Sequence, residues 1–276
     1  MIDFGLLKDA IASEWTKLRS VRSTYWTVLA AVILGIGLSA AIAAAAAHSY
    51  KDFDAHDRVF FDPTANSMVG LFFGQLALGV FGVLIMSAEY STGLVRMTMS
   101  AIPQRGYVLA AKTILAGVVS TVVALVIAFT SFNNGQLIFS TVERRDKFTG
   151  LVIPGDHLNV SLTAPHVLRA VFGAGFYIGG MVLIALGLAT IIRHTAGAIT
   201  AVVGIFFVLQ IVAQLLPSSL QHDVSRYLPA QAGMALFTVV PQGSTQLSFV
   251  PGTIVYFGWA AGFLLNGWYL LRTRDV

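Results

Sequence analysis

The sequence contains no cysteine, and charged side chains make up only 11% of its 276 residues. Without cysteine, disulfides, thiolate metal sites and thiol nucleophiles are excluded. A soluble domain usually carries about 25% charged residues, so the shortage of charge indicates an integral membrane protein. The 17 basic residues are spread along an apolar chain, which suits a membrane protein better than a partner of nucleic acid.

Six apolar runs are each long enough to cross a hydrocarbon core, which takes about 20 residues of helix. Backbone groups in lipid must be satisfied within the segment, so runs of this length are expected to be helices. Strands of a membrane barrel would alternate over about 10 residues, and these runs do not alternate. The sequence therefore predicts an all-α integral membrane protein with spans at about 25–47, 67–88, 107–132, 169–192, 195–216 and 250–271.

The distribution of Lys and Arg predicts the orientation of these spans. With the N-terminus inside the cell, ten of the 17 basic residues fall on the cytoplasmic side, although the outer segments are longer. Because basic residues concentrate in cytoplasmic loops, both termini are expected to be cytoplasmic, in the plasma or inner membrane. Residues 1–24 then precede a single transmembrane domain, 25–276, and the outer loops are 48–66, 133–168 and 217–249.

The segment before the first span has the pattern of an amphipathic helix. Its large apolar residues recur at spacings of three and four, which places them on one face, and they are Phe4, Leu7, Ile11, Trp15 and Leu18. The charged residues of this segment lie mostly on other faces. Such a helix is expected to lie in the membrane interface, either as a simple anchor or as part of a docking surface for a partner.

A polar segment, Glu89 to Lys112, separates the second and third spans. Glu89 is expected at the inner end of the second helix, and Thr92 is expected to cap a new short helix after it. Gly93 gives freedom where the chain changes direction, and Lys112 is expected to extend from the third span to the interface. The short helix would have an apolar side, which packs either on the protein's own helices and lipid or on a partner protein.

Two stretches, "SEWTKLRSVRSTYWT" and "SAEYSTGLVRMTMSAIPQRGYVLAAKTI", together with "RYLPAQAGMALF", resemble permease subunits of type-2 ABC exporters. The resemblance implies six spans, an N-terminal elbow helix, and a coupling helix between spans two and three at about Thr92–Ile102. That helix would dock on a separate ATPase subunit, which binds ATP and Mg²⁺, and the permease would pair with a second permease copy or with a similar permease. The resemblance thus assigns ATPase coupling to Glu89, Thr92, Gly93, Leu94, Val95, Arg96, Met97, Met99 and Ile102.

No catalytic or cofactor-binding motif is complete in the chain, so we expect a transport subunit and not an enzyme. Residues 106–113, "GYVLAAKT", nearly match a phosphate loop, but an alanine replaces its second glycine, no strand precedes it and a span follows. The six histidines lack the spacing of a zinc protease. His48, His56 and three nearby aspartates are better explained as a solvated acidic loop than as a metal site.

A few polar residues inside or beside the spans are candidates for lining a substrate cavity, and they are Gln75, Asn133, Gln210 and Gln214. The other interpretation is that they join helices within the protein. The remaining residues of the spans are apolar, which favours a lipophilic or amphipathic substrate. An ion-coupled carrier or channel, and a membrane sensor or anchor without transport activity, are the alternative functions.

Overall fold

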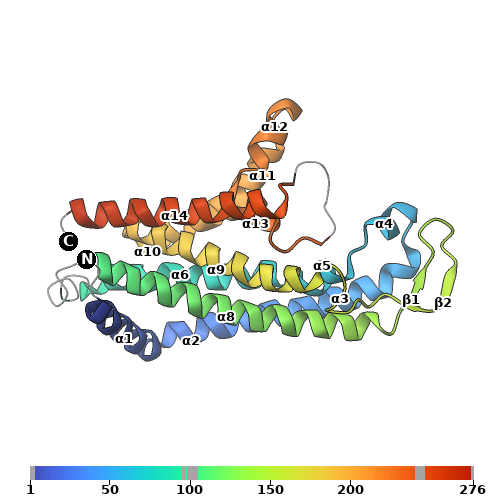
Figure 1. The fold of residues 1–276 in the computed structure, drawn as a ribbon, viewed down its shortest axis with the longest axis horizontal. Coiled ribbons are helices and arrows are strands. Elements are labelled where there is room, and N and C mark those ends of the chain that lie inside the picture. Colours follow the sequence, from blue (N-terminus) through green and yellow to red (C-terminus); the bar gives the residue numbers. More distant parts are fainter. Residues whose placement is uncertain (1–3, 95–96, 98–104, 240–245, 275–276) are drawn as a thin grey trace.

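The computed structural model describes residues 4–94, 97, 105–239 and 246–274. Within them, six helices are long and apolar enough to cross a membrane, which confirms the predicted number of spans and indicates a multi-pass membrane protein. The spans are Arg22–Asp52, Leu71–Thr92, Gly106–Phe139, Val167–Ile192, Thr195–Gln214 and Phe249–Thr273. They form one elongated bundle, and its first and last helices, α1 and α14, begin and end at the same end of it (Figure 1).

The first third of the chain forms α1, a composite first span and two short helices. The first span contains a π-helical turn, η1, whose Gly35 carbonyl oxygen accepts a hydrogen bond of 3.3 Å from the Ser131 hydroxyl. The elements are α1 (Phe4–Ser20), α2 (Arg22–Val32), η1 (Ile33–Gly37), α3 (Leu38–Ser49), η2 (Tyr50–Asp52), α4 (Ala55–Phe60) and α5 (Pro63–Met68).

The second and third spans differ from the predicted ranges at their ends. Because Asp62 caps α5 and Pro63 begins it, that helix is separate, and the second span, α6 (Leu71–Thr92), starts later than residue 67. The third span belongs to α8 (Arg105–Phe139) and runs beyond residue 132, since residues 133–139 continue the helix. The predicted outer loop 133–168 is therefore shorter than expected.

What remains of that loop carries a two-stranded antiparallel hairpin, β1 (Glu143–Arg145) and β2 (Val152–His157). Pro154, Gly155 and Asp156 are residues typical of turns, but they lie inside β2, and its partner strand precedes them. The hairpin extends from the end of the bundle opposite α1 (Figure 1). Next to it, a small core contains Tyr50, Phe139 and Leu158.

The fourth span, α9 (Val167–Ile192), lies at the centre of the bundle and packs against α6, α8 and α14 (Phe249–Thr273). The chain between α9 and α14 forms α10 (Thr195–Val203), a π-helical turn η3 (Gly204–Val208), α11 (Leu209–Gln214), α12 (Ser218–Ser225) and α13 (Pro229–Met234). The short helix α13 packs on α14, and three of its small residues are buried with Pro229.

Glycines allow close approach between the spans. A Cβ atom at Gly70 would lie 2.2 Å from the Gly35 carbonyl oxygen, and one at Gly179 would lie 2.1 Å from the Thr121 hydroxyl. Gly70 and Gly179 each belong to a G-x-x-x-G pair, Gly70/Gly74 and Gly175/Gly179, and both serve contacts within the chain. Gly258 and Gly262 differ, because a Cβ atom at either position meets no described atom within 4 Å.

Candidate functional site

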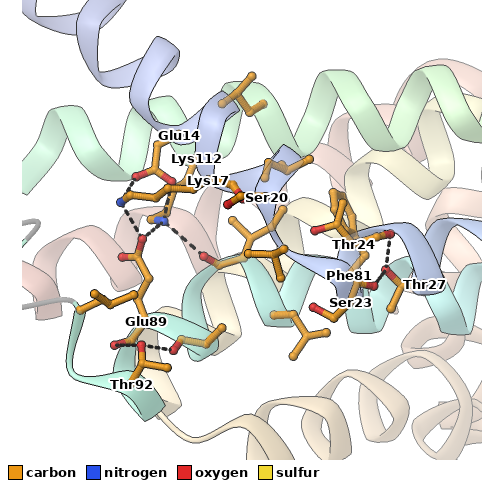
Figure 2. Close-up of a pocket in the computed structure, with 17 residues that line it drawn as sticks. Glu14, Lys17, Ser20, Ser23, Thr24, Thr27, Phe81, Glu89, Thr92 and Lys112 are labelled. Carbon is orange, nitrogen blue, oxygen red and sulfur yellow. Dashed lines mark hydrogen bonds and ion pairs between the residues drawn. The ribbon is translucent and has the colours of Figure 1, made fainter.

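Four charged side chains meet at the end of the bundle where α1 packs. The Lys112 ammonium of α8 lies 2.6 Å from Oε2 of Glu14, in α1, and 2.8 Å from Oε1 of Glu89, in α6. The Lys17 ammonium, also in α1, lies 2.8 Å from the other oxygen of Glu14 and 2.8 Å from Oε1 of Glu89. Figure 2 shows the four side chains converging from three helices. We call them the ion cluster.

Lys112 is the most deeply buried member of the ion cluster, with 2% of the residue exposed. Its ammonium also donates to the Ile85 carbonyl oxygen at 3.2 Å, so all three of its N–H groups have acceptors. The expectation that Lys112 extends to the interface was wrong, because two carboxylates from neighbouring helices hold it inside. A buried ammonium with complete pairing avoids most of the cost of burying a charge.

Lys17 differs from Lys112 because 37% of its side chain is exposed. Partial burial is the largest single influence and lowers the pKa of the Lys17 ammonium. The hydrogen bonds and charges of Glu14 and Glu89 together outweigh it and raise the pKa above its ordinary value of 10.5. Because of its exposure, Lys17 is the member of the ion cluster that solvent reaches most easily.

The local sequence explains why these residues meet. Ala10 and Glu14 are four residues apart on α1 and are its two buried residues, so they share the face that packs on α8. Glu89 lies in the last turn of α6, and Lys112 lies two turns into α8. Charges so close to a span require partners, and that requirement is the signal that could have linked Glu14 to Lys112.

A cavity of about 310 Å³ adjoins the ion cluster between α1, α2, α6 and α8. Its lining includes the apolar side chains of Leu18, Phe81, Leu84, Ile85 and Leu115. The lining also includes the four members of the ion cluster and five hydroxyl side chains, which are Ser20, Ser23, Thr24, Thr27 and Thr92. Figure 2 shows the hydroxyls of α2 along one side of the cavity and the ion cluster at its end. This combination suits an amphipathic ligand.

The segment assigned to ATPase coupling is only partly described. Thr92 does not begin a new helix as predicted; it ends α6, and its hydroxyl donates to the Ala88 carbonyl oxygen at 2.8 Å. Gly93 does mark the change of direction, with a left-handed φ of 72°. Leu94 and Met97 are 46% and 70% exposed. The remaining assigned positions, Val95, Arg96, Met99 and Ile102, lie outside the described residues.

The apolar stripe predicted for the N-terminal helix is divided in the structure. Leu7, Ile11 and Leu18 are half-buried, whereas Phe4 and Trp15 are exposed. The buried face is formed mainly by Ala10 and Glu14, residues that the periodicity argument did not select. Because a lipid phase would cover Phe4 and Trp15, their exposure agrees with a helix lying along a membrane surface.

The four polar residues proposed to line a substrate cavity have unlike environments. Gln75 is buried with 2% of its surface exposed, and its side-chain carbonyl oxygen has no hydrogen-bond partner among the described residues. Gln210 is half-buried, and Gln214 and Asn133 are exposed. The Asn133 amide donates to the Phe129 carbonyl oxygen of its own helix at 2.8 Å. None of the four lines the cavity beside the ion cluster.

The segment that resembles a phosphate loop is helical. Residues 106–113 belong to the first turns of α8. Their lysine, Lys112, is a member of the ion cluster and is bonded to Glu14 and Glu89. In the described part of the chain, no group of three or more His, Asp and Glu residues is arranged to hold a metal ion. In the acidic loop, the Asp54 carboxylate instead caps α4 by accepting from the Asp57 amide at 2.8 Å.

A comparison of the chain with models of known protein families gave no match, and a comparison with curated proteins also gave none.

Proposed function

We propose that this chain is the membrane-spanning permease subunit of an ATP-driven ABC exporter, which moves a lipophilic or amphipathic substrate across the plasma membrane. In this proposal α1 is the elbow helix, and the coupling helix that docks on a separate ATPase subunit lies in the segment between α6 and α8. The chain would act with a second permease copy or a similar permease, and both of its termini would be cytoplasmic. ATP and Mg²⁺ would bind only to the partner ATPase.

The observation that carries the proposal is the position of the ion cluster. Glu89 lies at the end of α6 and Lys112 near the start of α8, so the cluster joins the two helices on either side of residues 93–104. Glu14 and Lys17 extend the same connection to α1. A force applied to residues 92–102 would therefore act on the ends of two spans and on α1 together, which is the mechanical requirement for a coupled permease.

The exposure of apolar side chains beside the cluster also supports the proposal. Leu94 and Met97 are exposed at the end of the bundle that would face the cytoplasm. Burying two such side chains against a partner would contribute about 3–5 kcal/mol before the cost of association. Methionine suits such a contact because its side chain adapts to irregular surfaces.

The test is co-purification of the chain with its ATPase, a protein with a complete phosphate loop that is sought first in the adjoining reading frame. We expect the double substitution Leu94→Asp and Met97→Asp to abolish co-purification, because two charges would have to be buried in the contact. Leu151→Asp is the matched control, since Leu151 is 70% exposed on the hairpin at the opposite end.

Two results would count against the proposal. One is unchanged co-purification with the double variant, which would place the ATPase contact elsewhere. The other is transport by membranes that contain this chain alone, driven by an ion gradient and indifferent to ATP, which would favour an ion-coupled carrier.

A further inference from the structure

We propose that the cavity between α1, α2, α6 and α8 is a binding site for an acyl chain that carries an anionic head group. The acyl chain would lie against Phe81, Leu84 and Leu115, and the head group would lie at the junction of α1 and α2. An anionic phospholipid and a free fatty-acid anion share this chemistry. The inference requires only that the chain lies in a membrane, and it is independent of any ATPase partner.

The inner wall of the cavity fits a hydrocarbon chain. Its volume of about 310 Å³ is at the lower end of the range of about 300–1,000 Å³ for ligand sites. Leucine, isoleucine and phenylalanine side chains from α1, α6 and α8 form this wall. Water gains few hydrogen bonds against such a surface, so an acyl chain from the surrounding membrane is the favoured occupant.

The opposite wall provides a site for an anion at the start of α2. Ser20, Val21, Ser23 and Thr24 line the cavity where α1 ends and α2 begins. The residue before α2, Val21, has no side chain that can cap the helix, so the first amide groups of α2 receive no side-chain acceptor from it. The Thr24 amide donates to the Val21 carbonyl oxygen at 3.2 Å, so the helix dipole is what attracts an anion at this position.

The charges around the junction also favour an anion. The four members of the ion cluster neutralise one another, so they leave no net charge to attract a ligand. Arg19 and Arg22 are next in sequence to Ser20, Val21 and Ser23, which line the cavity, and both arginines are exposed. Neither arginine is paired with an acidic side chain in the described part of the chain. The unbalanced charge at the junction of α1 and α2 is therefore positive.

The position of the junction matches the level of lipid head groups. Tyr25 and Trp26, in the first turn of α2, are 58% and 69% exposed, and aromatic side chains of this kind favour the membrane interface. The Tyr25 hydroxyl donates to the Arg19 carbonyl oxygen at 2.9 Å, which holds the end of α1 against α2. A head group at the junction would thus be at interface depth while its chain enters the cavity.

Two neighbouring residues of α8 offer a matched test of the acyl-chain site. Leu115 lines the cavity, whereas Ile114 is 42% exposed on the outside of the bundle. The purified full chain would be reconstituted in phosphatidylcholine nanodiscs with a minor fraction of phosphatidylglycerol, and retained lipid would be counted by native mass spectrometry. We expect Leu115→Trp to reduce retained phosphatidylglycerol by at least about tenfold, since the indole fills the cavity, and Ile114→Trp to leave it unchanged.

A second pair of substitutions tests the head group. We expect Arg22→Gln to weaken retention about fivefold, because one cation at a membrane surface is worth about 1 kcal/mol. Lys8→Gln, which removes an exposed cation farther back on α1, should have no such effect. If Leu115→Trp lowers the thermal midpoint, Leu84→Phe provides a smaller filling of the same cavity.

Laurate added to the nanodiscs separates the two sources of the ligand. Displacement of phosphatidylglycerol by laurate would assign the site to free acyl anions as well as lipids, and resistance to displacement would assign it to phospholipid. The proposal is overturned if phosphatidylglycerol and laurate are both retained no better than phosphatidylcholine. It is also overturned if the folded Leu115→Trp and Leu84→Phe variants both retain as much phosphatidylglycerol as the parent chain.

Discussion

The two ends of α8 are anchored by different kinds of interaction. At one end Lys112 joins an ion cluster with partners 2.6 and 2.8 Å away on two other helices. At the other end Phe139 is fully buried and contacts Phe61, with the ring centroids 5.6 Å apart. Tyr50 and Phe53 extend this aromatic group with edge-to-face or tilted contacts.

The ion cluster at the α1 end is sensitive to the loss of a single charge, whereas the aromatic group around Phe139 is not. Ion pairs in a buried site depend on every partner, so the loss of one charge leaves the others without compensation. Aromatic contacts depend on area and shape, and no proton controls them. Packing should therefore hold the hairpin end together under conditions that loosen the α1 end.

The largest effect is expected from Lys112→Met, which removes the central cation while keeping a side chain of similar length. Glu14 and Glu89 would then share only Lys17, and a buried carboxylate would lack its partner. Breaking one partner of a buried pair costs about 3–5 kcal/mol. Thermal unfolding of the purified chain in detergent, followed by circular dichroism, measures this loss.

A double variant tests the cause of that loss. Glu89→Gln combined with Lys112→Met removes one charge of each sign, so it should recover part of the stability lost in the single variant. Lys51→Met is the control, because Lys51 is exposed and its substitution should change stability by less than about 0.5 kcal/mol. Equal losses in the single and double variants would contradict the charge explanation.

At the opposite end, Phe139→Ala should destabilise the protein by about 3 kcal/mol, because it leaves a cavity among the aromatic rings. The size of this loss should stay constant across the pH range in which the α1 end weakens. Leu137→Ala provides the comparison on the same helix, since Leu137 is 69% exposed. A strongly pH-dependent loss for Phe139→Ala would remove the contrast between the two ends.

The sequence predicted the spans better than it predicted what joins them. Long apolar runs identify a helix because the backbone N–H and C=O groups of a span must be hydrogen-bonded within the segment. Glu89 was placed correctly at the end of α6, since its charge is costly anywhere deeper. Glu14 and Lys112 are 98 residues apart, and periodicity within one segment carries no information about a partner on another. Their side chains were therefore predicted to face outward.

The same limit applies to the glycine pairs and the hairpin. Gly70, Gly179 and Gly262 each lie four residues from another glycine. Of these three, only Gly70 and Gly179 face neighbouring helices. In the outer loop, the partner of β2, Glu143–Arg145, is polar and has no strand pattern. Which of several equivalent positions is buried depends on the packing of the whole bundle.

Raising the pH should release α1 before it affects the hairpin. The pKa of Lys17 is raised in the folded protein, so its contribution to stability is present below 10.5 and is lost as the pH rises through the higher folded value. The chain has no native cysteine, so a single Ala10→Cys substitution, at a site 1% exposed beneath α1, can report opening by thiol labelling. Labelling of this introduced thiol should rise above pH 10.5 relative to an exposed Leu137→Cys reference.

Lys17→Met separates this effect from a general response to alkali. With the methionine in place, labelling of the same reporter should be faster at neutral pH and should lose its dependence on pH above 10.5. A reporter that stays protected in the parent chain at every pH would show that Lys17 does not hold α1 in place.

The smallest effect is expected at the turn of the hairpin, when the pH is lowered. The Asp146 carboxylate accepts from the Thr149 amide at 2.7 Å, from the Thr149 hydroxyl at 2.7 Å and from the Phe148 amide at 3.1 Å. These bonds, the Thr149 amide first, hold the pKa of Asp146 below its ordinary value of 3.8. Its contribution is therefore present above 3.8 and lost as the pH falls through the lower folded value.

Hydrogen exchange of residues 143–157, corrected for the intrinsic effect of pH, should accelerate below pH 3.8, while exchange at the Phe139 end of α8 stays constant. Asp146→Asn keeps an acceptor oxygen but has no proton to gain, so its exchange should not change over that interval. The partly exposed Arg144–Asp156 pair, 3.2 Å apart, is worth at most about 1 kcal/mol and is screened by salt. If acceleration persists in the Asp146→Asn variant but disappears at high salt, this pair and not the turn controls the hairpin.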